Sequence, residues 1–296
     1  MRTMLTILTP VYNRRDKIIK LYNSLVNQTC KEFQWLIVDD GSTDNVEELI
    51  ESIKRSEYSF VIDFVKKTNG GKHTAINYSH PFILGNMVAI VDSDDELIPN
   101  SVETILEKWS AFEHDESIGG IIFIKGRIND AIDTKLFIFD GVVGTPPKVM
   151  LDKNRQGGGF EIIRVSLLKR YPFPEIEGEK YIGESYLWNS IFRTYNMVCY
   201  NKVLYRFEFY EDGLTKHGRL LRLKSPKGCM ELENVILRRK PSFSVKFKNC
   251  ILYTAYGLIA KYHVGKICRL CYSKVIYISI FPGFVLYLYW KYKYKV

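Results

Sequence analysis

Acidic residues are missing from the end of this chain: residues 241–296 contain no Asp or Glu. The N-terminus lacks the basic region, long apolar core and small-residue cleavage site of a signal peptide, and only six cysteines are scattered along 296 residues. We therefore expect a reduced, cytosolic chain without a signal peptide. Hydrophobic residues (46%) and charged residues (25%) are near the average of globular proteins, which excludes collagen-like and wholly disordered chains. The length favours one main domain with an appendage.

The net charge of +9 comes entirely from the C-terminal part of the sequence. Residues 1–240 contain 33 basic and 33 acidic residues, so this part is neutral. Residues 241–296 add nine lysines and arginines, together with nine of the 20 tyrosines. A basic and aromatic segment is typical of proteins that bind membrane surfaces or nucleic acids.

Short apolar runs alternate with amphipathic segments over the first 125 residues. This pattern predicts an α/β fold with a mostly parallel central sheet flanked by helices. We expect strands at residues 5–9, 33–38, 61–65 and 87–91, and helices at 18–26, 44–53, around 75–76 and at 102–112. Residues 118–163 are predicted to be less regular and partly β, 186–195 to be helical, and 205–218 to form a loop.

Polar motifs follow the predicted strands at the points where they end. They are Thr9-Pro10-Val11-Tyr12-Asn13, Asp39-Asp40-Gly41-Ser42, Asn69-Gly70-Gly71-Lys72 and Asp92-Ser93-Asp94-Asp95. Ligands of open α/β sheets bind at the carboxyl ends of the strands, so we expect these motifs to line a binding site.

Two common nucleotide-binding motifs are excluded. The first turn contains no glycine, which excludes the dinucleotide-binding fingerprint. His73 follows Lys72 where a phosphate-binding loop needs Ser or Thr, and Lys66 stands where that loop needs its first glycine.

The acidic run that begins at Asp92 predicts a divalent metal site. Several carboxylates at one sheet edge repel one another unless a cation offsets their charge, and oxygen ligands suit Mg²⁺ and Mn²⁺. A calcium-binding loop is excluded because Glu96 and Leu97 occupy positions where that motif needs Asp or Asn and then Gly. The alternative is a solvated acidic turn in which Asp95 caps the next helix.

The Asp39-Asp40-Gly41-Ser42 motif has two interpretations. Asp, Gly and Ser are ordinary turn residues. The functional interpretation is a carboxylate that accepts the ring N–H of a pyrimidine base, with Thr9 and Tyr12 packing against the nucleoside.

The four motifs, in this order and approximate spacing, resemble the family 2 glycosyltransferases, which are inverting enzymes of the GT-A fold that use nucleotide-sugar donors. The resemblance covers about the first 215 residues and is densest before Pro99. It implies that Asp40 contacts the base, with Asp39 beside it. It further implies that Asp92 and Asp94 hold Mn²⁺ or Mg²⁺ with Asp95 adjacent. The nucleotide-sugar-binding residues expected on this basis are Thr9, Pro10, Tyr12, Asn13, Asp39, Asp40, Asn69, Gly71, Lys72, Asn77, Asp92 and Ser93.

The same resemblance implies that Glu184 is the catalytic base. The family usually carries its base in a Glu-Asp segment followed by aromatic residues, and here Glu184 precedes Ser185 and Tyr186. The departure is Ser185, where Asp is frequent. The alternative for Glu184 is an exposed carboxylate in the first turn of a helix. His217 is a further candidate metal ligand and, like Lys216 and His73, is alternatively an ordinary polar residue.

The C-terminal part is expected to be a separate extension. We divide the chain into a catalytic domain at residues 1–225 and a basic, aromatic, helical extension at 226–296 that associates with a membrane. Residues 275–290 are uncharged but interrupted by Pro282-Gly283, and a membrane span needs about 20 apolar residues. An interfacial segment therefore fits better. The alternative is a pair of helices packed on the catalytic domain.

Cys268 and Cys271 have the spacing of half a zinc site. No second pair of ligands stands at a suitable spacing, so we expect both thiols to pack on an apolar face.

The sequence thus predicts a metal-dependent, inverting glycosyltransferase. Its expected donor is a UDP-sugar and its acceptor a glycan or lipid-linked oligosaccharide at the cytoplasmic face of a membrane. One alternative is a metal-dependent nucleotidyltransferase, but residues 9–15 lack that class's glycine-rich loop. The other is a nucleic-acid-binding protein that uses the basic extension, which the neutral charge of residues 1–240 disfavours.

Overall fold

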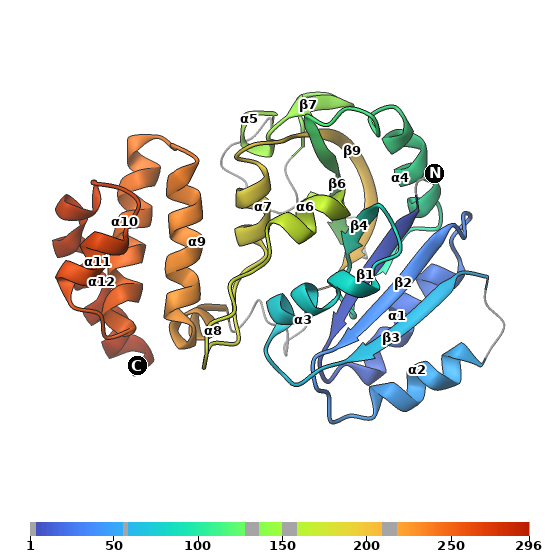
Figure 1. Ribbon diagram of the computed structural model, residues 1–296, viewed down its shortest axis with the longest axis horizontal. Helices are drawn as coiled ribbons and strands as arrows, with labels where there is room; N and C mark the ends of the chain where they lie inside the picture. The colour runs from blue at the N-terminus through green and yellow to red at the C-terminus, as the bar shows by residue number, and fades with distance from the viewer. Residues whose placement is uncertain (1–3, 56–58, 128–135, 150–158, 209–217, 296) are drawn as a thin grey trace. The chain divides into compact units, whose positions relative to one another are not determined.

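The computed structural model describes residues 4–55, 59–127, 136–149, 159–208 and 218–295 (Figure 1). These residues pack in two compact units. The first comprises Met1–Asn69, Ala75–Tyr171 and Thr194–Glu208, and the second comprises Gly70–Thr74, Pro172–Arg193 and Phe209–Val296. Residues 172–193 thus belong to the same compact unit as the C-terminal helices. The division into a catalytic domain and an extension at residue 225 stays a prediction.

One sheet of nine strands, counted over the described residues, forms the centre of the first unit. The strand order is β3-β2-β1-β4-β8-β6-β9-β5, and β7 pairs with β9. The strands are β1 Leu5–Val11, β2 Phe33–Asp39, β3 Val61–Lys66, β4 Met87–Ile90, β5 Glu96–Leu97, β6 Ile118–Arg127, β7 Val142–Gly144, β8 Gly159–Arg164 and β9 Asn196–Phe207.

The N-terminal half of the sheet has the predicted strands, and they are parallel. β1 lies between β2 and β4, and β2 also pairs with β3. In the other half β8 is antiparallel to both β4 and β6, and β9 is antiparallel to β5 and β7 while parallel to β6. The sheet is therefore mixed, with its parallel part confined mainly to the first 90 residues.

Helices cover the sheet because its strands are apolar on both faces. Alternate residues such as Leu5, Ile7 and Trp35 form one core with the buried faces of α1, α2 and α4. The helices of residues 15–170 are α1 Arg15–Val26, α2 Val46–Lys54, α3 Lys72–Tyr78, the 3₁₀ helix His80–Phe82, α4 Ser101–Ser110, α5 Pro146–Val149 and α6 Val165–Arg170.

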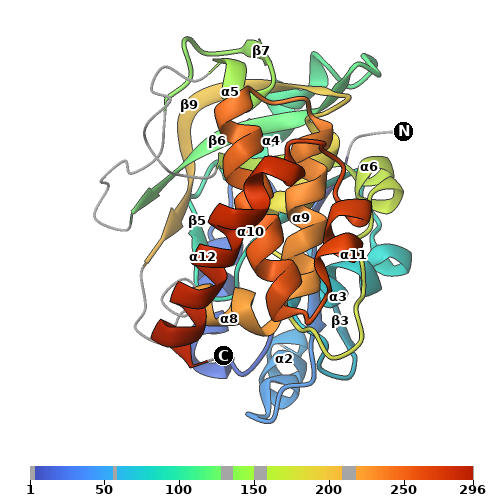
Figure 2. The ribbon, with the colours of Figure 1, turned by 90° about the vertical axis from the view of Figure 1, so that its left-hand side faces the viewer.

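The second unit is helical. Its helices are α7 Ser185–Ile191, α8 Gly218–Lys224, α9 Pro226–Arg238, α10 Phe243–Ile259, α11 Val264–Leu270 and α12 Ile276–Tyr294. α10 lies beside both α9 and α12 (Figure 2), around a core that includes Met230, Tyr253 and Trp290. Cys268 and Cys271 pack against this core, as predicted for thiols on an apolar face. In the described part of the chain, every helix is too short or too polar to meet the requirements of a membrane span.

α12 is one continuous helix, although Pro282 and Gly283 were predicted to interrupt it. Gly283 lies where α12 crosses α10: a Cβ atom added there would lie 2.4 Å from the Thr254 Cβ. The glycine therefore serves the close approach of two helices and does not mark a break.

Glu233 is a buried acid in the helical unit. Its side chain is on α9 with 6% of the residue exposed, and its Oε2 has no hydrogen-bond partner among the described residues. Burial raises the pKa of Glu233 to about 8, although the charges of Arg222, Lys248 and Arg219 act in the opposite direction. The folded state therefore favours the protonated acid.

We predict that Glu233 makes the protein less stable as the pH rises from about 4.5 to about 8. In this window the unfolded chain has lost the proton that the folded chain keeps, so the free energy of unfolding falls with rising pH. Glu233→Gln should remove this dependence. Between pH 5 and pH 8.5, the free energy of unfolding of the parent should fall by about 2 kcal/mol or more relative to that of Glu233→Gln. Urea unfolding at both pH values measures it, with Glu231→Gln on the same helix as control. Parallel pH profiles for the parent and Glu233→Gln would contradict the prediction.

Candidate active site

The parallel strand pairs bring the predicted motifs of the first unit to one edge of the sheet. Val11 at the end of β1 pairs with Asp39 at the end of β2, and Asp39 pairs with Lys66 at the end of β3. On the other side of β1, Leu8 pairs with Ile90, the last residue of β4. The turns that follow these four strands therefore begin at the same edge.

Asp40 connects the turn after β2 with the turn after β3. The residue is 2% exposed; its Oδ2 accepts a hydrogen bond from Asn69 Nδ2 at 3.1 Å, and its Oδ1 accepts one from Lys67 Nζ at 2.9 Å. Asn69 Nδ2 also donates to the Asp40 carbonyl oxygen at 2.9 Å. Gly41 has φ +77°, and a Cβ there would lie 2.8 Å from the Asn69 nitrogen. The sequence prediction included Asp40 and Asn69 but missed Lys67.

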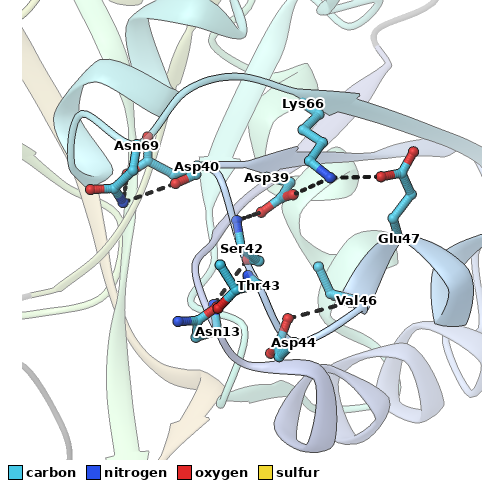
Figure 3. A network of polar contacts seen from close by, with 10 residues as sticks. All are labelled: Asn13, Asp39, Asp40, Ser42, Thr43, Asp44, Val46, Glu47, Lys66 and Asn69. Atoms are coloured by element: carbon cyan, nitrogen blue, oxygen red, sulfur yellow. Dashed lines mark hydrogen bonds and ion pairs between the residues drawn. The ribbon is translucent and has the colours of Figure 1, made fainter.

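Asp39 has a different role from its neighbour. Its Oδ1 accepts a hydrogen bond from the Ser42 N–H at 2.9 Å, and its Oδ2 lies 3.9 Å from Lys66 Nζ. Lys66 also pairs with Glu47 of α2 at 2.8 Å. In Figure 3, Asp39 points toward Lys66 while Asp40 points toward Asn69. Asp39 therefore stabilises its own turn and, through Lys66, the start of α2, whereas the Asp40 carboxylate is directed toward Asn69.

Asn13 ties the turn after β1 to the turn after β2. Its N–H donates to Ser42 Oγ at 2.9 Å, and its Oδ1 accepts from the Thr43 N–H at 2.8 Å (Figure 3). Its positive φ of 51° suits Asn, which tolerates the left-handed region. The preceding Tyr12 is 49% exposed, so its ring is accessible at this edge.

Thr9 and Pro10 lie within β1 and are buried. The Thr9 hydroxyl accepts a hydrogen bond from Trp35 Nε1 at 3.0 Å. Side chains alternate between the faces of a strand, so Thr9 shares the core-facing side of Leu5 and Ile7. The Thr9 hydroxyl thus stabilises the sheet, which differs from the predicted nucleoside contact.

The acidic turn after β4 is organised by Tyr205 of β9. The Asp92 N–H donates to Tyr205 Oη at 3.3 Å, and the Tyr205 hydroxyl donates to Asp95 Oδ2 at 2.5 Å. Asp94 Oδ2 lies 3.9 Å from Arg14 Nε. Ser93, between the two acids, is buried. Neither Tyr205 nor Arg14 was predicted from the sequence. Tyr205 lies far along the sequence from the acidic turn, and Arg14 lies just outside the first motif.

Electrostatics make this turn unfavourable for three ionised acids. Burial, and next the charge of Asp92, raises the pKa of Asp94 above its usual value. The same causes in the same order raise the pKa of Asp95 to about 7. A cation bound at the turn would lower both pKa values. The described residues nevertheless contain no group of three or more His, Cys, Asp or Glu side chains arranged to hold a metal ion.

In the second unit, Lys72 and Glu184 form an ion pair. Glu184 is the N-cap residue of α7, and Lys72 is the first residue of α3. Gly71 has φ +96°, and a Cβ there would lie 2.0 Å from the Lys180 carbonyl oxygen. Only glycine allows this close approach of the two segments. His73 is buried, with its ring 6.2 Å from that of Phe173.

Three other residues from the sequence analysis remain. Asn77 is half-buried on α3. His217 and Lys216 lie outside the described residues.

We predict that Asp40 and Asn69 are energetically coupled. Asp40→Ala and Asn69→Ala should each destabilise the protein, and the double variant should cost less than the sum by about 0.5–3 kcal/mol, because each single change removes the same hydrogen bonds. Urea unfolding of the four proteins measures the coupling. Ser110→Ala serves as the control: its hydroxyl donates to the Glu107 carbonyl oxygen within α4, so this change should combine additively with Asp40→Ala. Additive effects of Asp40 and Asn69 would contradict the prediction.

Two solved structures share this fold. TarS residues 1–349 from S. aureus, in complex with UDP-GlcNAc, superpose with a TM-score of 0.61 at 16% identity, over 99% of this chain and 91% of that chain. A mannosyltransferase from Pyrobaculum calidifontis, in complex with GDP-Man and Mn²⁺, superposes with a TM-score of 0.57 at 14% identity, over 98% and 88%. At these identities the likeness establishes the fold, which is of the GT-A type.

Relatives found by sequence are named as glycosyltransferases. A Campylobacter jejuni GalNAc(5)-diNAcBac-PP-undecaprenol beta-1,3-glucosyltransferase is 24% identical over 87% of this chain and 82% of its own length. An Escherichia coli UDP-Glc:alpha-D-GlcNAc-diphosphoundecaprenol beta-1,3-glucosyltransferase is 26% identical over 67% and 73%. An uncharacterized glycosyltransferase of Rickettsia conorii is 31% identical over 50% of this chain, but the match covers only 25% of that longer protein.

The sequence profile of Glycosyl transferase family 2 matches residues 6–214, which include the four strand-end motifs and Glu184. The chain belongs to glycosyl transferase family 2.

Proposed function

We propose that this protein is an inverting, metal-dependent glycosyltransferase that moves a sugar from a UDP-sugar to a hydroxyl group of a lipid-linked glycan. The observation that carries the proposal is the convergence, at one sheet edge, of the Asp40–Asn69 pair and the acidic turn at Asp92 and Asp94, within a family 2 sequence. The names of the C. jejuni and E. coli relatives support the lipid-linked acceptor, and the UDP-GlcNAc in the TarS complex supports the UDP donor.

The nucleoside end of the donor is proposed to bind beside Asp40. Its carboxylate accepts the ring N–H of uracil, while Asn69 and Lys67 fix the position of that carboxylate. The exposed ring of Tyr12 packs against the nucleoside, and Asn13 holds the Tyr12 turn in place. Lys72 and Asn77 are proposed to lie near the ribose or diphosphate of the donor. Pro10, Gly71, Asp92 and Ser93 stay proposed donor-binding residues.

The residues of the acidic turn fit a divalent cation. Their donor atoms are carboxylate oxygens, which Mn²⁺ and Mg²⁺ accept. Burial and the charge of Asp92 raise the pKa of Asp94 and of Asp95, and a bound cation would offset that charge. Asp92 and Asp94 would hold the ion, and Asp95 is positioned by Tyr205 next to them. When bound, the ion supplies positive charge that stabilises the leaving diphosphate.

Glu184 is proposed to be the catalytic base. A hydroxyl group is a weak nucleophile, and a carboxylate that takes its proton in the transition state accelerates transfer by about 10²–10⁴-fold. The carboxylate of Glu184 receives that proton as the acceptor oxygen bonds to the anomeric carbon and the bond from that carbon to the diphosphate breaks. Lys72 orients the carboxylate beforehand through the ion pair. Attack from the face opposite the diphosphate inverts the anomeric centre.

The proposed acceptor places the reaction at the cytoplasmic face of a membrane, where the protein would be peripheral. Membership of a sugar-transferring family favours this function over the nucleotidyltransferase and nucleic-acid-binding alternatives.

Glu184→Gln is predicted to bind the donor normally and to lose sugar transfer by about 10²–10⁴-fold, because the amide cannot accept the proton. Product formation measured by chromatography, beside UDP-sugar affinity measured by calorimetry, separates the two effects. Glu177→Gln changes an exposed acid of the same loop and should transfer at the parental rate. Parental transfer by Glu184→Gln would remove Glu184 from the role of base.

Asp94→Asn is predicted to lower kcat/KM by at least about 100-fold and to make the residual rate insensitive to a chelator, since the loss of one carboxylate weakens the hold on the cation. Rates are measured with Mn²⁺, with Mg²⁺ and with chelator. Asp16→Asn, on the exposed start of α1, is the matched control and should retain full metal-dependent activity. Equal metal dependence in the parent and in Asp94→Asn would contradict this assignment of the cation site.

A further inference from the structure

An uncovered apolar stripe runs along α12. Large side chains are about half exposed or more at successive turns, with Phe281 75% and Tyr292 88% exposed. The stripe consists of Tyr277, Ile278, Phe281, Val285, Leu288 and Tyr292. Large apolar side chains that are contiguous and exposed mark a surface that binds something.

The stripe occupies one side of the helix. At 100° per residue its six side chains fall within an arc of about 100°, and from Tyr277 to Tyr292 it is about 22 Å long. The buried residues of α12, among them Ser279, Gly283 and Trp290, lie on the opposite side. That side packs against α10, which is next to α12 in Figure 2. α12 is therefore held by its inner side, and the stripe is its outer side.

Lysines and tyrosines border the stripe. Lys274 precedes it by one turn, and Lys291 and Lys293 fall near its two edges on the helical wheel. Lys293 Nζ donates a hydrogen bond to Tyr289 Oη at 3.0 Å, and Lys291 Nζ lies 5.9 Å from the centre of the Tyr287 ring. No acidic residue occurs in residues 241–296. Tyrosine and lysine around an apolar surface is the composition of helices that lie in a membrane interface.

We propose that the α12 stripe docks on the surface of an anionic bilayer, with its apolar side chains in the boundary between headgroups and acyl chains and the bordering lysines on lipid phosphates. Charge complementarity selects this occupant: a stripe edged only by cations matches an anionic leaflet. The helix lies along the membrane surface, and the other helices of its unit stay outside the lipid. This inference rests on the proposed function in one respect: a lipid-linked acceptor explains why the enzyme would contact a membrane.

Vesicle co-sedimentation of the full chain tests the proposal. Vesicles of equimolar phosphatidylglycerol and phosphatidylcholine should bind the parent, and pure phosphatidylcholine vesicles should bind it at least about tenfold more weakly. Phe281→Ser/Val285→Ser, which leaves the charge unchanged, should lower the partition to anionic vesicles by at least about tenfold. The matched control, Leu84→Ser/Val61→Ser, removes two exposed apolar side chains from the first unit and should bind like the parent.

A second pair of changes tests the cations. Lys291→Gln/Lys293→Gln should weaken binding to anionic vesicles by at least about tenfold and leave binding to neutral vesicles unchanged. Thermal unfolding of every variant verifies that the helical unit is folded, which the exposure of the changed side chains predicts.

The proposal would be overturned if the parental protein stays in the supernatant, or if the parent and Phe281→Ser/Val285→Ser bind vesicles equally. It would also be overturned if the parent is a dimer, the variant is a monomer, and neither protein binds vesicles. The last result would make a second copy of the chain the occupant. Donor hydrolysis without lipid is measured on the same preparations. Hydrolysis without vesicle binding would refute the docking surface alone, and vesicle binding without any nucleotide-sugar response would refute the proposed function alone.

Discussion

The parallel pairing of β1 with β2 and β4 is the constraint on which the candidate site depends. Because these strands run in the same direction and are in register, the polar turns that end them gather at one edge. In the turn after β4, the run Asp92-Ser93-Asp94-Asp95 places carboxylates near one another, which costs free energy. Each carboxylate is accordingly held by a donor from elsewhere in the chain: Asp40 by Asn69 and Lys67, and Asp95 by Tyr205. Burial and the charge of Asp92 raise the pKa of Asp95, and a cation bound at this turn would lower it.

The helical unit depends on close approach in a similar way. Gly71 and Gly283 stand where a methyl group would meet another segment, at Lys180 in one case and at Thr254 in the other. The first contact positions Lys72 for its ion pair with Glu184, and the second seats α12 on α10 with its apolar stripe outward. The same unit thus carries the proposed base and the proposed membrane surface. Its buried Glu233, whose Oε2 has no hydrogen-bond partner within the described part of the chain, lies in the same unit.

Sequence reasoning predicted the parallel strands and their motifs because period, turn residues and strand ends are local signals. It did not find Tyr205, since a tyrosine on β9 reaches the acidic turn only through a strand order that long-range pairing determines. Thr9 was predicted to contact the nucleoside because all residues of the first motif were assigned to the site together. The alternation of side chains along β1 instead turns Thr9 into the core, where its hydroxyl accepts a hydrogen bond from Trp35. Pro282 suggested a break for the same local reason, yet packing of Gly283 on α10 keeps α12 continuous.

The sheet edge that carries Tyr12, Asp40 and Asp94 is proposed to bind a uridine nucleotide sugar with a divalent cation. The first measurement is thermal unfolding of the parental protein across a panel of UDP-, GDP-, ADP- and dTDP-sugars, each with Mn²⁺ and with chelator. We expect one or more UDP-sugars to raise the Tm, the other nucleotide sugars to leave it unchanged, and chelator to abolish the rise. Stabilisation by a non-uridine nucleotide sugar alone, or by none of the panel in the presence of Mn²⁺, would contradict it.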